Sequence, residues 1–459
     1  MIDNNPLASM PLGRLIFKYS VPAIISMLVN AVYNFVDRLF IGNMPKPADI
    51  SSAGGIDIGA LAISGVGIAL PIMTVAMAFA FLIAIGAATN MSLEMGRAAL
   101  ARAKAMAGNA FTLSVLTGGA LTVIYFLFSD SILKLFGASA LTAPYAKSYM
   151  AAIAIGFIPW LLGISLNHII RADGSPKRSA AIMIIGALLN VPLDYLFIFV
   201  FNMGVFGAGL ATVISQTIST IIGLEYYFSK RANLTLDFSS LIPKKIYLKM
   251  IVVIGITPFV LNFAMSFSQA LTNNVLMKYG GDLSVGAMTT VGAILMLYFM
   301  PVFGLTQGMQ PIVGFNYGAR NYERAKKAFF ITVLAATAFL TVGYICALFF
   351  PEPMILMFNK DPELLEITLD AIRKMALLLP TVAVSIVGTN YMLSIGKSGI
   401  ALFLSLLRQI LVYIPAILIL PFFFGLSGVW YTLPVGDFIS LIFVVAVLSR
   451  EFKSYKKRA

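Results

Sequence analysis

Twelve apolar segments, each long enough to cross a lipid bilayer, dominate this sequence. A membrane-spanning helix needs about 20 mostly apolar residues, because hydrocarbon offers the backbone no hydrogen-bond partners outside the helix. Of the 459 residues 59% are hydrophobic and 11% are charged, whereas a soluble domain carries about 25% charged residues. The pattern predicts an all-α integral membrane protein with twelve transmembrane helices. The segments lie approximately at 19–41, 58–89, 105–129, 148–169, 179–201, 205–229, 250–277, 284–316, 328–350, 375–395, 398–420 and 425–449.

The 32 lysines and arginines are distributed unevenly between the two sides of these segments. The even-numbered connections and both chain ends carry most of them, including the groups at 97–104 and 324–327. Positive residues accumulate on the cytoplasmic side of membrane proteins. We therefore expect a multi-pass protein of the cytoplasmic (inner) membrane with both termini in the cytoplasm. The net charge of +13 needs no nucleic-acid partner to explain it.

The two halves of the chain repeat at an offset of about 222 residues. Each half holds six spans, an even number, so both halves have the same orientation in the membrane. This arrangement predicts two six-helix lobes related by a pseudo-two-fold axis along the membrane normal, as in some transporters. We assign the lobes to residues 1–229 and 250–459, joined by a basic cytoplasmic linker at 230–249. The clearest repeated residues are Gly96, Arg102, Ala103 and Lys104 in the first half, and Gly318, Arg324, Ala325 and Lys326 in the second.

Polar side chains gather in the outer half of the first lobe. Asp37 lies near the outer end of the first span, and Asn190 and Asp194, four residues apart, share one face of the fifth. Thr212 follows the small residues at 204–211, which let another helix approach closely. Charged groups inside spans are costly and usually functional. Two carboxylates, an amide and a hydroxyl suit a hard cation or a proton, although each acid could instead pair with a nearby base.

The second lobe lacks the matching acids. Asn273 stands where the repeat places the counterpart of Asp37. Arg408 and Asp437 lie near the middle of the eleventh and twelfth spans, which a short connection joins. An unpaired charge at that depth costs at least about 2.5–3.5 kcal/mol, so we expect an ion pair. The alternative is that each residue faces a wet cavity separately.

The sequence offers little for catalysis. His168 and Cys346 are the single histidine and cysteine, which excludes a His/Cys metal site and an intrachain disulfide. A phosphate-binding glycine-rich loop with its lysine is missing, and so is a Ser-His-acid constellation. We therefore expect neither an enzyme nor a bound cofactor.

Four stretches, taken in order, resemble the multidrug and toxic compound extrusion (MATE) family. The resemblance covers essentially the whole chain and implies a twelve-helix secondary transporter. It also implies that Asp37, Asn190, Asp194 and Thr212 bind the coupling cation, as in the subgroup whose acids lie in the N-terminal lobe. Other branches carry coupling acids in spans 7 and 10, which this sequence lacks; Gln269 is the nearest polar candidate in span 7. The stretches are NAVYNFVDRLFIGN (30–43), IIRADGSPKR (169–178), NVPLDYLFIF (190–199) and GVFGAGLATVISQ (204–216).

These observations predict a secondary active exporter that exchanges small organic, often cationic compounds for H⁺ or Na⁺. We expect a monomer surrounded by lipid, with Na⁺ or a proton at the four polar residues of the first lobe. The substrate is expected to pass between the lobes beside an apolar surface containing methionine and aromatic residues. The alternative for this surface is ordinary core packing. The substrate-path candidates are Asn34, Met265, Gln269, Met296, Tyr298, Met300 and Arg408.

Other functions fit the sequence less well. A lipid-linked precursor flippase of the same superfamily is the main alternative, but it needs a basic central cavity, and Arg408 is the one lysine or arginine deep inside a predicted span. An integral-membrane enzyme needs clustered catalytic groups that face one compartment. A channel does not need an acidic cluster in one lobe alone.

Overall fold

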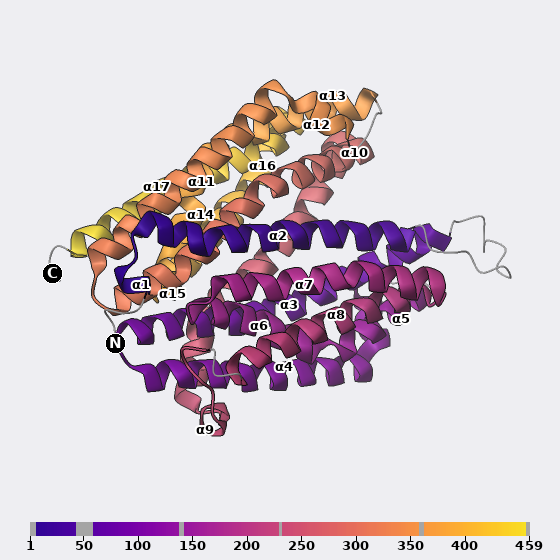
Figure 1. Ribbon diagram of the computed structural model, residues 1–459. Coiled ribbons are helices and arrows are strands. Elements are labelled where there is room, and N and C mark those ends of the chain that lie inside the picture. The colour runs from indigo at the N-terminus through magenta and orange to yellow at the C-terminus, as the bar shows by residue number, and fades with distance from the viewer. Residues whose placement is uncertain (1–5, 43–57, 137–141, 229–231, 358–361, 456–459) are drawn as a thin grey trace. The chain divides into compact units, whose positions relative to one another are not determined.

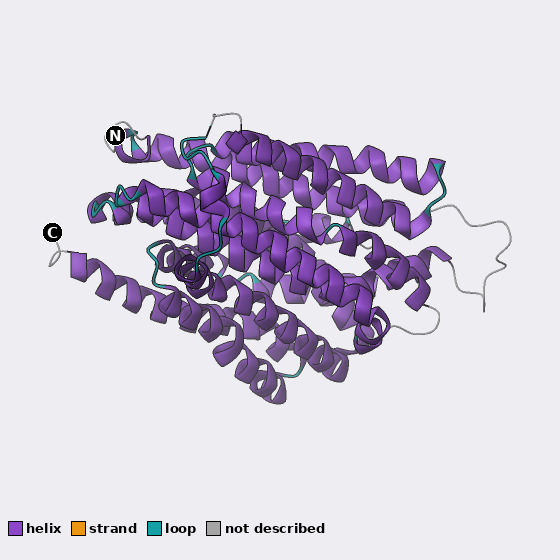
Figure 2. Ribbon diagram, turned by 90° about the horizontal axis from the view of Figure 1, so that it is seen from below, coloured by secondary structure: helices purple, strands orange, loops and turns teal. Residues whose placement is uncertain are grey.

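The computed structural model describes residues 6–42, 58–136, 142–228, 232–357 and 362–455. Every regular element in these ranges is a helix (Figures 1 and 2). Within the described ranges, ten helices are long and apolar enough to cross a membrane, and two further helix pairs, each bent in the middle, can bring the number to twelve. The predicted all-α membrane fold is confirmed, because long apolar runs satisfy their backbone hydrogen bonds within helices.

The first half of the chain contains one broken span. Helices α5 and α6 meet at Gly156 with a bend of 55° where the sequence predicts one span at 148–169. Pro159 explains the break, because proline lacks the amide proton that a continuous helix would direct to the Ile155 carbonyl. The helices are α1 (Pro6–Ser9), α2 (Leu12–Gly42), α3 (Ile58–Gly96), α4 (Leu100–Leu135), α5 (Ala143–Ile155), α6 (Phe157–Ala172), α7 (Pro176–Tyr195), the π-helix η2 (Leu196–Val200), α8 (Gly204–Phe228) and α9 (Phe238–Leu241).

In the second half, one span is bent like the α5–α6 span of the first half, and two predicted spans are joined in a single long helix. The predicted seventh and eighth spans form α10, which Gly281 interrupts with a φ of 65° that glycine adopts without strain. Helices α13 and α14 are bent by 56° near the predicted tenth span. The helices are α10 (Lys245–Gly318), α11 (Tyr322–Phe349), α12 (Pro351–Leu356), α13 (Pro362–Met375), α14 (Leu379–Ser394), α15 (Ser398–Leu406), the π-helix η3 (Leu407–Val412), α16 (Tyr413–Phe424) and α17 (Leu426–Tyr455).

The described residues pack as two compact units. The first unit comprises Ile25–Glu94 and Ala99–Gly255, and the second comprises Met1–Ile24, Met95–Ala98 and Ile256–Ala459. The boundary between the units therefore passes through α2 after Ile24. The lobe limits inferred from the sequence repeat, with a linker at 230–249, stay a prediction.

Small residues on α8 determine how closely it packs in the first unit. A Cβ atom added to Gly209 would lie 2.8 Å from the Ala152 Cβ and 2.9 Å from the Tyr149 carbonyl oxygen, both on α5. Tyr149 belongs to a buried cluster that includes Phe157 and Trp160 of α6. The predicted close approach of a helix to the start of α8 is therefore confirmed, and it carries Thr212 into the interior of the unit.

Candidate cation site

Helices α7 and α8 bring three of the predicted polar residues together. The Asn190 Nδ2 donates to the Asp194 Oδ1 and to the Thr212 Oγ1, each at 3.4 Å. The Thr212 hydroxyl itself donates to the Ala208 carbonyl oxygen at 3.1 Å. Because the hydroxyl proton points to the backbone, the hydroxyl oxygen presents a lone pair to the asparagine. All three side chains are buried.

The backbone of α7 is irregular at this site. Pro192 lies inside the helix between Asn190 and Asp194 and removes the bond to the Leu188 carbonyl. The π-helix Leu196–Val200 follows within one turn of Asp194. Such π segments frequently mark functional positions in helices. The sequence contains no signal that distinguishes this π-helix from an α-helix.

Asp37 reaches the same region from α2. Its side chain is buried, and it lies close enough to Asp194 for the two negative charges to repel each other. Two buried carboxylates next to each other are stable only if a proton or a cation reduces their repulsion. Hydrogen bonds therefore join Asn190, Asp194 and Thr212 of the predicted cation site, and Asp37 lies within electrostatic range of Asp194.

On the α7 side of the site, two oxygen atoms lack hydrogen-bond donors within the described part of the chain. These atoms are the Asn190 Oδ1 and the Asp194 Oδ2, both buried. A buried acceptor without a donor is costly, and oxygen ligands of this kind suit a hard cation. No group of three or more His, Cys, Asp or Glu side chains that could hold a metal ion occurs among the described residues. With two carboxylates, the four residues fit one small monovalent cation or a proton.

The predicted ion pair is present inside the second unit. The Arg408 Nε lies 2.7 Å from the Asp437 Oδ1. The Asp437 side chain is 4% exposed and the Arg408 side chain 24%. Arg408 lies within the π-helix Leu407–Val412. The two central charges of this unit therefore neutralise each other.

The proposed substrate-path residues occupy different surroundings. Met265 and Gln269 lie on an exposed face of α10, and the Gln269 amide donates to the Asn273 Oδ1 at 3.1 Å. Tyr298 points instead to α12, where its hydroxyl lies 3.3 Å from the Met354 sulfur. Met265 and Gln269 are therefore accessible from this face of α10. The Tyr298 side chain instead contacts Met354 of the same unit.

Three other candidates complete this set. Met296 is exposed and Met300 is half-buried, both on α10. Position 34 is part of α2, but the side chain of Asn34 lies outside the described residues. The role of the substrate-path residues stays a prediction.

A further buried carboxylate, which the sequence pattern did not single out, lies in the turn after α6. Asp173 is fully buried, and its Oδ2 accepts bonds from the Tyr226 hydroxyl at 2.5 Å and the Asn233 backbone amide at 2.8 Å. Its Oδ1 accepts a bond from the Leu234 amide at 3.2 Å. Burial raises the pKa of Asp173 to about 6, against the smaller opposing effect of these bonds. The carboxylate ties the segment after α8 to the turn after α6. Asp173 lies in the stretch 169–178, one of the four that resemble the MATE family, and this position was the one feature of the sequence that pointed to it.

Comparisons with known proteins place this architecture in a family. The family model MatE matches residues 22–196 and 258–419. The multidrug export protein MepA of Staphylococcus aureus (strain MSSA476) is 24% identical over 441 residues, which cover 95% of this chain and 93% of MepA. MepA of Staphylococcus haemolyticus (strain JCSC1435) is 24% identical over 439 residues, which cover 94% of this chain and 93% of that protein.

Solved structures share the fold over nearly the whole chain. A multidrug resistance MATE family transporter of the MOP superfamily, in an outward-facing conformation, has a TM-score of 0.89 at 22% identity and covers 99% of this chain and 98% of its own. A MOP superfamily transporter from Pyrococcus furiosus Vc1, for which reverse polarity of the binding pocket suggests a different function, also has a TM-score of 0.89 at 22% identity, with 98% of both chains covered. At this identity the likeness shows the fold alone. Together with the match to the family, it confirms the resemblance found in the sequence: the chain belongs to the MATE family of multi-pass membrane transporters.

Proposed function

We propose that this transporter exports small organic, often cationic compounds in exchange for H⁺ or Na⁺. The observation that supports coupling is the buried cluster of Asp37, Asn190, Asp194 and Thr212 in the first unit, in which the Asn190 Oδ1 and the Asp194 Oδ2 have no donor among the described residues. The multidrug export proteins among the relatives support the substrate class.

The cluster is suited to coupling because its free energy depends strongly on a positive charge. Without a cation or proton, Asp37 and Asp194 repel each other inside an apolar environment. The Asn190 amide group donates to Asp194 and Thr212, which leaves its carbonyl oxygen available for a cation. A conformation that separates the carboxylates or admits water is therefore favoured when the site is empty. This difference in affinity between two conformations is what couples a gradient to transport.

The flippase alternative has less support from the second unit. A site for a lipid-linked phosphate requires cationic groups that are free to bind it. The guanidinium of Arg408 is already engaged by Asp437 at 2.7 Å. Asp437 therefore neutralises the positive charge of Arg408, the residue on which a phosphate site in this unit would depend.

Substitution of the two acids tests the proposed coupling. Asp37→Asn and Asp194→Asn each remove a negative charge with little change in shape. Each should reduce gradient-driven export of a fluorescent organic cation from proteoliposomes to the level of empty liposomes. Asp370→Asn is the matched control, because Asp370 forms an exposed ion pair with Lys374 and should leave export unchanged. Normal export by both site variants would contradict the proposal.

Thr212 can distinguish the two coupling ions. Thr212→Val keeps the shape of the side chain but removes one oxygen ligand. If Na⁺ drives export, the variant should need a higher Na⁺ concentration for half-maximal export in liposomes with a Na⁺ gradient alone. If protons drive export, the dependence on an imposed pH gradient should be unchanged, because the carboxylates remain.

A further inference from the structure

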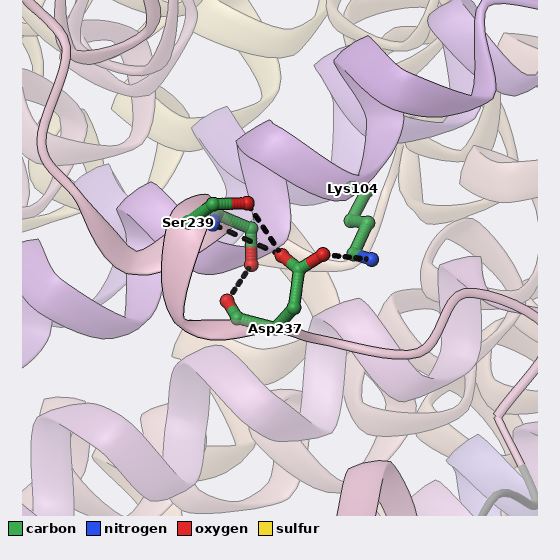
Figure 3. Close-up of polar contacts among 4 residues, drawn as sticks. Lys104, Asp237 and Ser239 are labelled. Carbon is green, nitrogen blue, oxygen red and sulfur yellow. Dashed lines mark hydrogen bonds and ion pairs between the residues drawn. The ribbon is translucent and has the colours of Figure 1, made fainter.

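A surface near the start of α4 in the first unit is covered by the segment that follows α8. Asp237 caps the short helix α9, and its side chain accepts bonds from the Ser239 hydroxyl at 3.0 Å and the Ser240 amide at 3.1 Å. The Lys104 ammonium group of α4 donates to the same carboxylate at 2.7 Å (Figure 3). This bond lowers the pKa of Asp237 to about 2, so the carboxylate is ionised at neutral pH. An anion therefore sits against the start of α4.

The backbone of the covering segment lies directly on α4. The Asn109 amide donates to the Ser240 carbonyl oxygen at 3.2 Å, and the Thr112 hydroxyl donates to the Leu241 carbonyl oxygen at 2.5 Å. A Cβ atom on Gly108 would lie 2.2 Å from the Ser240 carbonyl oxygen. The face of α4 that carries positions 108, 109 and 112 is therefore filled by the chain itself.

The corresponding face in the second unit is open. At the offset of about 222 residues, Ala105, Gly108 and Asn109 of α4 correspond to Lys327, Phe330 and Ile331 of α11. These three residues of α11 line a cleft of about 700 Å³. The first turn of α2, with Leu12 and Gly13, forms another part of its wall, and Arg324 and Glu323 complete the charged lining. No described segment of the second unit occupies the cleft as α9 does on α4.

The charged end of the cleft offers donors for an anion. The Arg324 Nη2 donates to the carbonyl oxygens of Leu7 and Met10, which holds the guanidinium in place. Its buried Nε has no hydrogen-bond partner among the described residues. Lys327 is exposed and has no ion-pair partner in the described part of the chain. One carboxylate, that of Glu323, opposes these two cations, so the lining carries a net positive charge.

The walls of the cleft are apolar beyond this charged end. Phe330 is 51% exposed, and Leu334, one turn further along α11, is 72% exposed. Phe17, one turn after Gly13 on α2, is 69% exposed. The cations lie in the first two turns of α11, where its apolar segment begins. Basic pockets at the ends of transmembrane helices are suited to lipid headgroups.

We propose that this cleft binds the phosphate headgroup of an anionic phospholipid, with an acyl chain along Phe330 and Leu334. Arg324 and Lys327 contribute charge-assisted hydrogen bonds to the phosphate oxygens. The lipid lies on the face of α11 that corresponds to the face of α4 covered by Ser240 and Leu241. The apolar surface next to the cations favours a lipid over a free phosphate ion. The proposal does not depend on the exported compound or on the coupling ion.

Native mass spectrometry of the full-length protein in a neutral detergent tests this site. Dioleoylphosphatidylglycerol should bind in preference to dioleoylphosphatidylcholine at equal concentration. Lys327→Gln should weaken the binding of phosphatidylglycerol about fivefold, as expected for the loss of one lysine near a lipid phosphate. Glu323→Gln should strengthen it, because the variant removes the opposing carboxylate. Lys326→Gln is the matched control, since its ammonium group lies over the Phe452 ring, 5.7 Å from the centroid, and should bind lipid as the native protein does.

Three results would overturn the proposal. Equal binding of the two lipids would show that the headgroup charge is not recognised. An equal loss in Lys326→Gln and Lys327→Gln would show a diffuse effect of surface charge. Displacement of phosphatidylglycerol by millimolar inorganic phosphate would show that the cleft is a site for free phosphate. Poor folding can only weaken lipid binding, so the stronger binding expected for Glu323→Gln tests the site even if Lys327→Gln folds poorly.

Discussion

Three sets of buried charged residues are compensated by their neighbours in different ways. Arg408 and Asp437 neutralise each other, while Asp173 accepts bonds from uncharged donors. Asp194 has a neighbouring carboxylate, Asp37, and an oxygen without a donor. An isolated charge in an apolar interior is costly, so the first two arrangements are complete within the protein. The third leaves two carboxylates in the same buried site, which is why we propose it for coupling.

The ion pair in the second unit should be visible in a double-mutant cycle. Arg408→Ala leaves Asp437 buried without a partner, and the loss of one member of a buried pair typically costs about 3–5 kcal/mol. Asp437→Ala in the same protein removes the orphaned charge and should recover part of this loss. Thermal unfolding of the purified variants in detergent measures the effect. Additive losses in the double variant would argue against a stabilising pair.

Asp173 should make stability depend on pH. Its pKa is raised to about 6, so the folded protein binds this proton more tightly than the unfolded chain does. Stability from this group is therefore present below pH about 4 and is lost as pH rises through about 6. The unfolding temperature of the native protein should fall over that interval relative to Asp173→Asn, which cannot titrate. Identical pH profiles for the two proteins would exclude this contribution.

Among the helices, two π segments lie at or next to buried charged residues. The π-helix at Leu196–Val200 follows Asp194, and the π-helix at Leu407–Val412 contains Arg408. A π segment adds a residue to one turn and changes the direction of the side chains around it. The spans at α5–α6 and α13–α14 are bent instead of continuous. Hydropathy predicts that a segment crosses the membrane, but it does not respond to these local changes in backbone geometry.

Close helix packing gives a prediction at the same scale. Gly209→Leu places a large side chain where a Cβ atom alone would lie 2.9 Å from the Tyr149 carbonyl oxygen. Overpacking of this kind typically costs about 1–3 kcal/mol, so the unfolding temperature should fall. Gly67→Leu on α3 is the control, because nothing lies within 4 Å of a Cβ atom there. A similar change in both variants would indicate a general effect of leucine instead of a specific contact.

For the whole molecule, the distribution of lysine and arginine leads to a proposed orientation. We expect both termini in the cytoplasm, because the even-numbered connections and the chain ends carry most of the 32 cationic residues. The proposal follows from charge alone and is independent of the substrate.

Reporter fusions test this orientation in cells. Alkaline phosphatase fused after Phe136, where three spans precede the junction, should be active because it is exported. The same enzyme fused after Ala459 should be inactive, and a green fluorescent protein at that position should fluoresce. An active phosphatase at the C-terminus would reverse the proposed orientation.

The order of residues is enough to predict the membrane class, the approximate spans and the acids of the first half. Hydropathy and charge distribution are properties of residues that are contiguous in the chain, so they can be evaluated without knowing how the helices pack. The packing of the helices, in contrast, decided that Asn190 donates to Thr212 and that Asp173 is buried. It also decided that Asp237 covers α4 while the matching face of α11 stays open. These facts depend on which faces of different helices meet, and residues far apart in sequence contribute to each of them.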